Sequence, residues 1–472
     1  MGEEISRTSF DLADHERFMS RVAEETRLVQ TLFEDGQFSE RGYTLGFEIE
    51  TGLIDHNYFP APKNEEFLDV LNHPLAVPEL SRFNVELNCT PVLMGGSALS
   101  RAQLELQELW NHCNEVAHGL DSNMVMIGIL PTLRDKDLTL ANLSPLKRYY
   151  ALNNEIVRQH RGQAIKVDID GREHLTSEHG DVLLEAAATS FQIHLKTPAH
   201  LAHRYYNASL MVSGPILAAS ANAPFLFGRS LWDETRIPLF EQAIDLRGVH
   251  ESTQRVTFGS GFLERSITEC MAENVEEYPS LLPLLFDEPP EALRHLRLHN
   301  GTIWRWNRPL IGFEPDGRPH MRIEHRILPS GPTIADMIAN TALYCGLVHA
   351  LVQTGEDERS NFPFEAARRN FYSAARYGLD AELYWPGGGN LHAGSLLENH
   401  LLPLAHVGLR AFGISDGDRE FFLNIVAGRL ESGQTGAVWQ RRAYEKTQNL
   451  FETTAMYCER QRSGQPVGDW DI

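Results

Sequence analysis

Two glutamates separated by one apolar residue lie near the start of the chain, in the segment GFEIETG at residues 46–52. The surrounding sequence, YTLGFEIETGLI, is typical of a half-buried strand. Glu48 and Glu50 must then project from the same side, because side chains alternate along a strand. If that side faces water, the pair means little. If it faces a cleft, two adjacent carboxylates are costly unless a cation lies between them.

Three further segments place polar side chains at alternate positions of an apolar strand: RFNVELNCTP, SFQIHLKTP and HMRIEHRILPSG. The polar residues that share one side of these strands are Glu86, then Gln192, His194 and Lys196, and then Arg322, Glu324 and Arg326. Carboxylates with one imidazole suit Mg²⁺ or Mn²⁺ better than zinc, which prefers nitrogen and sulfur ligands. An arginine two residues beyond an acid adds a fixed cation to the same surface, which suits a nucleotide phosphate.

Each segment also has a simpler interpretation. A lone E-x-E pair is more often the wet side of an antiparallel sheet, and a single histidine in an apolar strand is most often a hydrogen-bonded core residue. Spacing alone does not show that the four segments meet. Their joint occurrence is what favours a metal and phosphate site.

The elements that would carry these residues are strands early and in the middle of the chain, separated by unequal insertions. Helices are expected at about 11–33, 98–120 and 144–160, a strand at NMVMIGILP, and a hairpin in IKVDIDGREHL. The uncharged run at 205–228 predicts a buried helix that breaks at Gly214-Pro215 and continues as a loop. Residues 331–472 are expected to be mainly helical, with a capping box at Thr333 and Asp336.

This order predicts an α+β protein rather than a regular βαβ series. No linker clearly divides the chain, so we expect one large catalytic domain over residues 1–472, with the sheet and its motifs in 43–330 and the helical third packed on it.

Composition restricts the partners. The chain has 42 Lys and Arg against 64 Asp and Glu, a formal charge of −22, which opposes attraction to nucleic acid or an anionic membrane. Five widely spaced cysteines without a CxxC motif are typical of a reducing compartment, and the start of the chain lacks the pattern of a signal peptide. We therefore expect a cytoplasmic protein with small-molecule ligands and no nucleic-acid or membrane partner.

At these same residues the chain resembles the glutamate-cysteine ligase type 2 and carboxylate-amine ligase family. The resemblance covers about residues 43 to 330, and it consists of five segments in order: GFEIETG, VELNCTP, SFQIHLKT, ANAPFLFGRSLWDETR, and GTIWRWNRP followed by MRIEHRI. It implies a glutamine synthetase-like fold, in which a curved, mainly antiparallel sheet forms a funnel-shaped active site flanked by helices.

The resemblance also implies roles for individual residues. The implied metal ligands are Glu48, Glu50, Glu86, His194 and Glu324. Arg326 would face the phosphates, and Arg308 and Arg236 would hold phosphate or the carboxylate substrate, with Arg229 and Lys196 as further substrate-binding candidates. The chain departs from the family where Gln192 replaces the first histidine of an H-x-H strand and where Ser230 to Glu234 replaces a small, glycine-containing segment.

The implied reaction is ATP-dependent amide formation with Mg²⁺ or Mn²⁺, in which a small carboxylate is activated as an acyl phosphate and then captured by an amine. Glutamate and cysteine are the natural first pair. The sequence contains neither a G-x-S-x-G nucleophile motif nor a P-loop, as expected for a reaction that depends on positioning and charge neutralisation. Two alternatives stay open: a kinase of the same fold that acts on a guanidino or carboxylate group, and a non-catalytic nucleotide- or metabolite-binding relative. A homo-oligomer is compatible with each of them.

Overall fold

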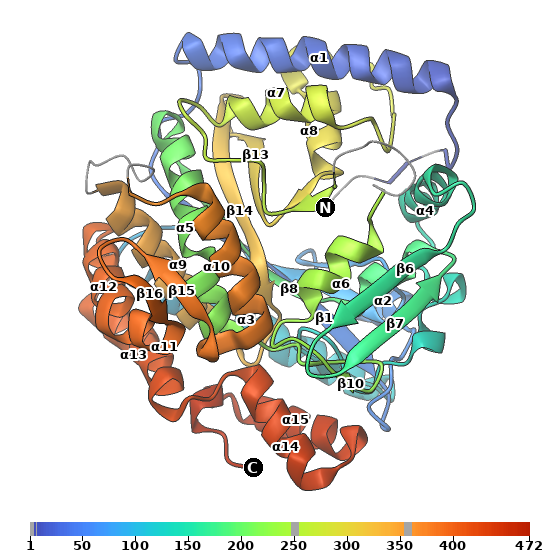
Figure 1. Cartoon of the computed structure of the whole chain (residues 1–472). Helices are drawn as coiled ribbons and strands as arrows, with labels where there is room; N and C mark the ends of the chain where they lie inside the picture. Colours follow the sequence, from blue (N-terminus) through green and yellow to red (C-terminus); the bar gives the residue numbers. More distant parts are fainter. Residues whose placement is uncertain (1–3, 6, 247–253, 354–360) are drawn as a thin grey trace.

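A curved antiparallel sheet forms the centre of the computed structural model, which describes residues 4–5, 7–246, 254–353 and 361–472 (Figure 1). Its main strand order is β13-β14-β8-β1-β3-β2, and β4 and β5 also pair with β1. The strands of this sheet are β1 (Thr44–Ile54), β2 (Ala76–Pro78), β3 (Asn84–Asn88), β4 (Val92–Leu93), β5 (Asn123–Val125), β8 (Ser190–Thr197), β13 (Asn307–Phe313) and β14 (Pro319–Pro329). The predicted α+β class with a curved antiparallel sheet is confirmed.

The two faces of the sheet differ as the alternation predicts. In β1, Leu45, Phe47 and Ile49 are buried, whereas Glu48 and Glu50 on the other face are partly accessible. One face therefore packs into the core and the other opens toward solvent.

Helices α5 (Ala202–Ser220) and α9 (Ile334–Gln353) cover the apolar face. The ring of His325 in β14 stacks on Tyr344 of α9, with centroids 4.1 Å apart. Asn307 Nδ2 of β13 donates to Ser213 Oγ of α5 over 3.0 Å. Because His325 and Glu324 are neighbours in a strand, Glu324 points away from these helices.

Two boundaries differ from the sequence prediction. Helix α5 does not break at Gly214-Pro215 but runs on to Ser220, with every residue from Tyr205 onward buried. A β-carbon at Gly214 would lie 2.8 Å from Asn370, so close packing against α10 (Phe364–Tyr377) holds the helix through the proline. The strand predicted at NMVMIGILP covers only β5, because Met126 N donates to Gln461 Oε1 instead of to a neighbouring strand.

The remaining elements surround the sheet. Helix α1 (Leu12–Glu34) lies across α7 (Thr268–Glu277) and α8 (Arg294–Gly301) (Figure 1). The other helices are α2 (Asn64–Leu71), α3 (Ala98–Gly119), α4 (Lys147–Gln159), α6 (Arg236–Ala243), α11 (Ala393–Leu396), α12 (Leu402–Ala411), α13 (Asp416–Ser432), α14 (Gly436–Thr447) and α15 (Leu450–Ser463). The short strands outside the main sheet are β6 (Ile165–Asp170), β7 (His174–His179), β9 (Phe225–Leu226), β10 (Arg229–Ser230), β11 (Val256–Thr257), β12 (Trp304–Arg305), β15 (Glu382–Trp385) and β16 (Gly389–His392).

Helix α9 connects the sheet to the helical third. Thr333 Oγ1 accepts a hydrogen bond from Asp336 N and donates one to Asp336 Oδ2, so the two predicted capping residues do pair at its start. The helix is long and apolar enough to cross a membrane, but 94% of the relevant window is buried inside the protein. Core helices of water-soluble proteins share this property, so α9 gives only weak evidence for a membrane span.

Candidate active site

The strand pairings bring the predicted site residues into one row across the open face of the sheet. Gly46 in β1 lies opposite His194 in β8, His194 lies opposite Glu324 in β14, and Glu324 lies opposite Arg308 in β13. Glu48 is the next residue of β1 after Gly46 on the same face. Because Gly46 has no side chain, the imidazole of His194 is left open toward Glu48, whose Oε1 lies 3.2 Å from His194 Nε2.

The carboxylate of Glu324 in this row is held by two arginines. Glu324 is buried, and it accepts two hydrogen bonds from Arg308, at 2.7 and 2.9 Å, and a third from Arg326 Nη1 at 3.2 Å. Burial alone would raise the pKa of Glu324, but the two guanidinium groups hold it well below its usual range. In the same way, His194 outweighs burial and holds the pKa of Glu48 at about 2. Both groups are therefore carboxylates at neutral pH.

These residues fit a divalent cation. Ligand atoms from Glu48, His194 and Glu324 all lie within 4.8 Å of one another, the only such group found among the described residues. His194 is 7% exposed, yet neither ring nitrogen makes a well-formed hydrogen bond within the described part of the chain. A buried imidazole whose nitrogens make no well-formed hydrogen bond is costly, and coordination of a metal would satisfy one of them. The donor set of two carboxylates and one imidazole suits Mn²⁺ or Mg²⁺.

Glu50 and Glu86 lie further along the same face, directly opposite each other in β1 and β3. Glu50 accepts hydrogen bonds from Ser190 N (2.6 Å) and Gln192 Nε2 (3.0 Å), and Gln192 Oε1 accepts one from Arg326 (3.2 Å). Gln192, which departs from the family pattern, thus links Glu50 to Arg326. Burial raises the pKa of both glutamates, and the neighbouring acid Glu48 adds to the effect at Glu86.

The structure adds two acids that the sequence analysis missed, Glu79 and Glu185. Burial and neighbouring carboxylates raise the pKa of Glu79 to about 7 and that of Glu185 to about 8. Glu79 precedes β3 in a loop and Glu185 lies in a short 3-10 helix, so neither has the strand alternation that revealed the others. Since four carboxyls with raised pKa values gather at this end, the site can accommodate more positive charge than its arginines provide.

Two of the predicted substrate-binding residues lie close to this face. Arg236 is buried, donates to Glu234 Oε1 (2.8 Å) and the Ile327 carbonyl (2.7 Å), and its charge opposes the raised pKa of Glu50. Lys196 lies in the row beyond His194, opposite Arg322 of β14, and its Nζ contacts Glu314 Oε1 at 2.9 Å. The two cations therefore lie toward opposite ends of the acidic cluster.

The structure does not bring Arg229 to the cluster. Its side chain is 56% exposed and pairs with Glu173 at 3.0 Å, which ties the β9-β10 hairpin to the turn between β6 and β7. An exposed pair between two hairpins is typical of a surface contact.

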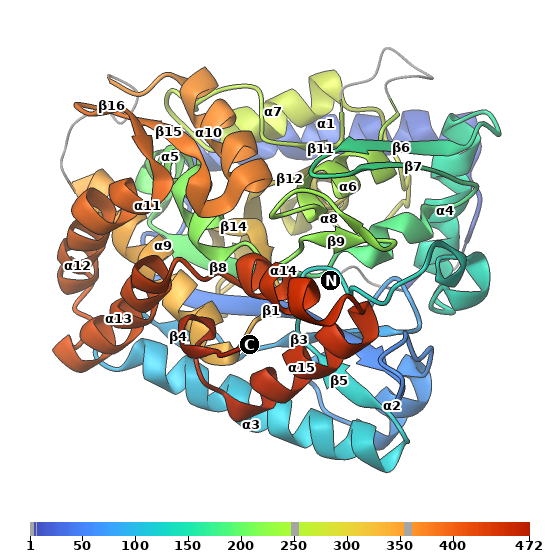
Figure 2. The ribbon, with the colours of Figure 1, turned by 60° about the horizontal axis from the view of Figure 1, so that its bottom comes forward.

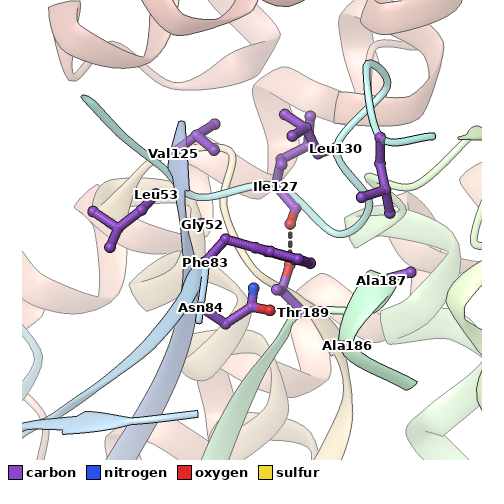
Figure 3. Close-up of a pocket in the computed structure, with 11 residues that line it drawn as sticks. Gly52, Leu53, Phe83, Asn84, Val125, Ile127, Leu130, Ala186, Ala187 and Thr189 are labelled. Carbon is purple, nitrogen blue, oxygen red and sulfur yellow. Dashed lines mark hydrogen bonds between the residues drawn. The ribbon is translucent and has the colours of Figure 1, made fainter. Parts of the chain in front are cut away.

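A small cavity lies beyond the Glu50 end of β1, beside Gly52 (Figure 3). Its volume is about 20 Å³, and it is lined mainly by apolar side chains such as Leu53, Phe83 and Val125. Thr189, which precedes β8, closes one side by donating to the Ile127 carbonyl (Figure 3). The space suits about one water molecule and is too small for a substrate.

Comparisons with known proteins bear on the fold and the family of the chain. Among solved structures, the chain is similar to a glutamate–cysteine ligase from Francisella tularensis in complex with AMP, with a TM-score of 0.53, 11% identity and coverage of 90% of each chain. It also matches a bifunctional glutathione synthetase from Pasteurella multocida over 95% of this chain and 54% of that one, with 8% identity and a TM-score of 0.48. At such identity the first likeness shows a shared fold. No curated protein sequence matches the chain.

The family model for glutamate-cysteine ligase family 2 matches residues 44–464, a span that includes every site residue named above. Because this match covers most of the chain, the protein belongs to glutamate-cysteine ligase family 2.

Proposed function

We propose that the protein, as an ATP-dependent carboxylate-amine ligase, joins the carboxylate of glutamate or a similar acid to the amine of cysteine or another amino acid. Family membership supports the reaction class. The observation that carries the proposal is the row of Glu48, His194 and Glu324 with Arg326 beside it, on the open face of the sheet.

The reaction has two steps. An oxygen of the substrate carboxylate attacks the γ-phosphorus of ATP, the bond to the bridging oxygen breaks, and an acyl phosphate and ADP form. The amine then attacks the acyl carbon, inorganic phosphate leaves, and the amine gives up its proton. Charge neutralisation and alignment supply most of the rate enhancement in such phosphoryl transfers.

The arginines divide this work. Arg326 Nε is buried and has no hydrogen-bond partner among the described residues, so it has a donor left for a phosphate oxygen. Arg308 is occupied by Glu324 and the Gly301 carbonyl, and in this proposal it fixes the position of Glu324. A divalent cation held by Glu48, His194 and Glu324 would neutralise charge on the phosphates.

The two cations at the ends of the acidic cluster have different proposed roles, Lys196 in binding the substrate and Arg236 in positioning β14. A substrate carboxylate can compete with Glu314 for Lys196, which is only 14% exposed and therefore interacts strongly with a bound anion. Arg236, buried between Glu234 and β14, would act through the position of that strand. We also propose a cytoplasmic location, which the five free, buried cysteines support.

The test is a screen of ADP and phosphate release with pairs of acids and amines, starting with glutamate and cysteine, in the presence of Mg²⁺ or Mn²⁺. We expect release only when both substrates are present, an amide product by mass spectrometry, and no turnover in Glu48→Gln. A stable phosphorylated product without an amide would favour a kinase and overturn the ligase proposal. No release across a broad panel, despite nucleotide binding, would favour a non-catalytic role.

A further inference from the structure

Gln192 is a buried amide on the open face of the sheet. It lies in β8, the strand between β1 and β14 (Figure 2), and directly opposite Glu48 of β1. The residue is 2% exposed. It is also one of the two places at which the chain departs from the family pattern, and the proposed reaction gives it no role of its own.

The neighbours of this amide fix the direction in which it points. Nε2 donates to Glu50 Oε1 (3.0 Å) and to Ser190 Oγ (3.2 Å), and Oε1 accepts from Arg326 Nη1 (3.2 Å). The reverse orientation would place the carbonyl oxygen against a carboxylate and the NH₂ group against a guanidinium. Because both N–H donors are used, the side chain is held as a neutral link between an acid and a base.

The acid and the base that Gln192 links do not pair with each other. Burial raises the pKa of Glu50, and the charge of Arg326 opposes that rise. Yet across the described residues Glu50 has no ion-pair partner, and Arg326 pairs with Glu324 at 3.2 Å. Opposite charges attract more strongly away from bulk water, so something must keep these two groups apart. The amide of Gln192 lies between them.

A direct pair would take both groups out of use. Guanidinium and carboxylate groups commonly bind through two parallel hydrogen bonds, which would turn free donors of Arg326 toward Glu50. With Gln192 in place, Arg326 Nε has no hydrogen-bond partner in the described part of the chain, so it stays available to a phosphate oxygen. Each oxygen of Glu50 accepts one hydrogen bond, from Gln192 or from Ser190, and keeps a lone pair for a cation.

We propose that Gln192 is a positioning residue that acts as a neutral spacer. It prevents Arg326 from pairing with Glu50 in the empty site, and the guanidinium therefore stays ready for the nucleotide phosphates. Gln192 adds no charge and acts only through Arg326. The inference rests on the proposed function in one respect, namely that Arg326 binds a phosphate.

Gln192→Met tests the spacer, because methionine keeps the length of the side chain and removes the amide donors and acceptor. In calorimetric titrations with ADP at saturating Mn²⁺, we expect a dissociation constant about tenfold above that of the wild type, the loss of about one hydrogen bond to a charged group. In the Glu50→Gln background no carboxylate is left to pair with Arg326, so the same substitution should change the constant by less than about twofold. Equal losses in the two backgrounds, or no loss in either, would overturn the proposal.

Stability distinguishes a spacer from an ordinary structural amide. In Gln192→Met the groups of Glu50 and Arg326 can pair directly, so the metal-free variant should melt close to the wild type. Asn370→Leu is the matched control, since Asn370 of α10 is 3% exposed and bonds both backbone groups of Tyr384 at 2.8 Å, outside the site. This control should melt at a lower temperature and keep the ADP affinity of the wild type. A Gln192→Met protein that melts as low as the control would contradict the spacer role.

A crystal structure of ligand-free Gln192→Met completes the test without any need for nucleotide binding. We expect Arg326 and Glu50 to form an ion pair with a nitrogen–oxygen distance within about 4 Å. An Arg326 side chain that keeps its wild-type position, unpaired with Glu50, would overturn the spacer role. A wild-type protein that binds no ADP would instead contradict the proposed function, so the two failures are distinguishable.

Discussion

Replacing Glu324 with glutamine removes one negative charge from between two guanidinium groups while it keeps the volume of the side chain. The carboxylate is 2% exposed and accepts hydrogen bonds of 2.7 and 2.9 Å from Arg308 and 3.2 Å from Arg326. In the variant, the two arginines face each other without an anion. Because the loss of one partner from a buried ion pair typically costs about 3–5 kcal/mol, we expect the free energy of unfolding of the metal-free protein to fall by at least ~3 kcal/mol.

Glu48→Gln is the matched comparison, because Glu48 belongs to the same ligand group but not to the arginine cluster. Its side chain is 17% exposed and its ion-pair partner is His194, at 3.2 Å. We expect a smaller loss of stability than for Glu324→Gln, because Glu48 has one charged partner instead of two and is more exposed. Both variants should lose turnover and weaken Mn²⁺ binding by at least about 10–100-fold, the factor reported for losing even an outer partner of a metal site.

Urea denaturation of the metal-free proteins measures the stability difference, and electron paramagnetic resonance measures bound Mn²⁺. Equal stability of the two variants would refute the role of the arginine pairs in stabilising the fold. Wild-type Mn²⁺ affinity in either variant would show that the replaced residue is not a ligand.

Further predictions concern three other charged residues and one glycine. Arg229→Ala should leave turnover unchanged and alter the free energy of unfolding by less than about 1 kcal/mol, because its pair with Glu173 is exposed. A loss of activity in this variant would instead place Arg229 in the site. Arg236→Gln should lower the free energy of unfolding by about 3–5 kcal/mol in the same denaturation assay, because its pair with Glu234 is buried. Burial raises the pKa of Glu185 to about 8 in the folded protein, so this group stabilises the metal-free protein at low pH, and the contribution is lost as pH rises from about 4.5 through about 8. Glu185→Gln should therefore gain stability relative to the wild type as pH increases across that window, and parallel stability curves for the two proteins would contradict the assignment. Gly331→Ala should be severely destabilising in thermal melts, because the residue has φ +78° and an added β-carbon would meet the Met126 carbonyl.

The sequence predicted which polar side chains share one face of the sheet wherever they follow the period of a strand. Glu48, Glu86 and Glu324 were recognised because each interrupts an apolar alternation on one side, and the pairings of β1, β3, β8 and β14 bring those sides together. A period-2 pattern predicts which face of a strand a side chain occupies, and the strand pairing in the sheet determines which side chains become neighbours.

Glu79 and Glu185 could not be found in this way. A loop and a short 3-10 helix have no repeating pattern of apolar and polar residues. A buried acid within them therefore cannot be distinguished by sequence from a solvent-exposed one. Only the tertiary structure reveals that burial and neighbouring carboxylates raise the pKa of both groups. Helix α5 is a similar case. Local propensity predicts a break at Gly214-Pro215, but the packing of Gly214 against Asn370 keeps the helix continuous.

Six glutamates gather on the open face of the sheet, namely Glu48, Glu50, Glu79, Glu86, Glu185 and Glu324, against the arginines 236, 308 and 326. A nucleotide is itself a polyanion, and the chain as a whole carries a formal charge of −22, so the bare site opposes the ligand that the family reaction requires. Two of these arginines pair with Glu324 and the third with Glu234, which leaves little uncompensated positive charge among them. In the proposed reaction, the attraction for phosphate would come from cations that bind with the nucleotide, because the excess of acid favours them. The same acidity that opposes attraction to nucleic acid would then favour a small nucleotide that binds together with a divalent metal.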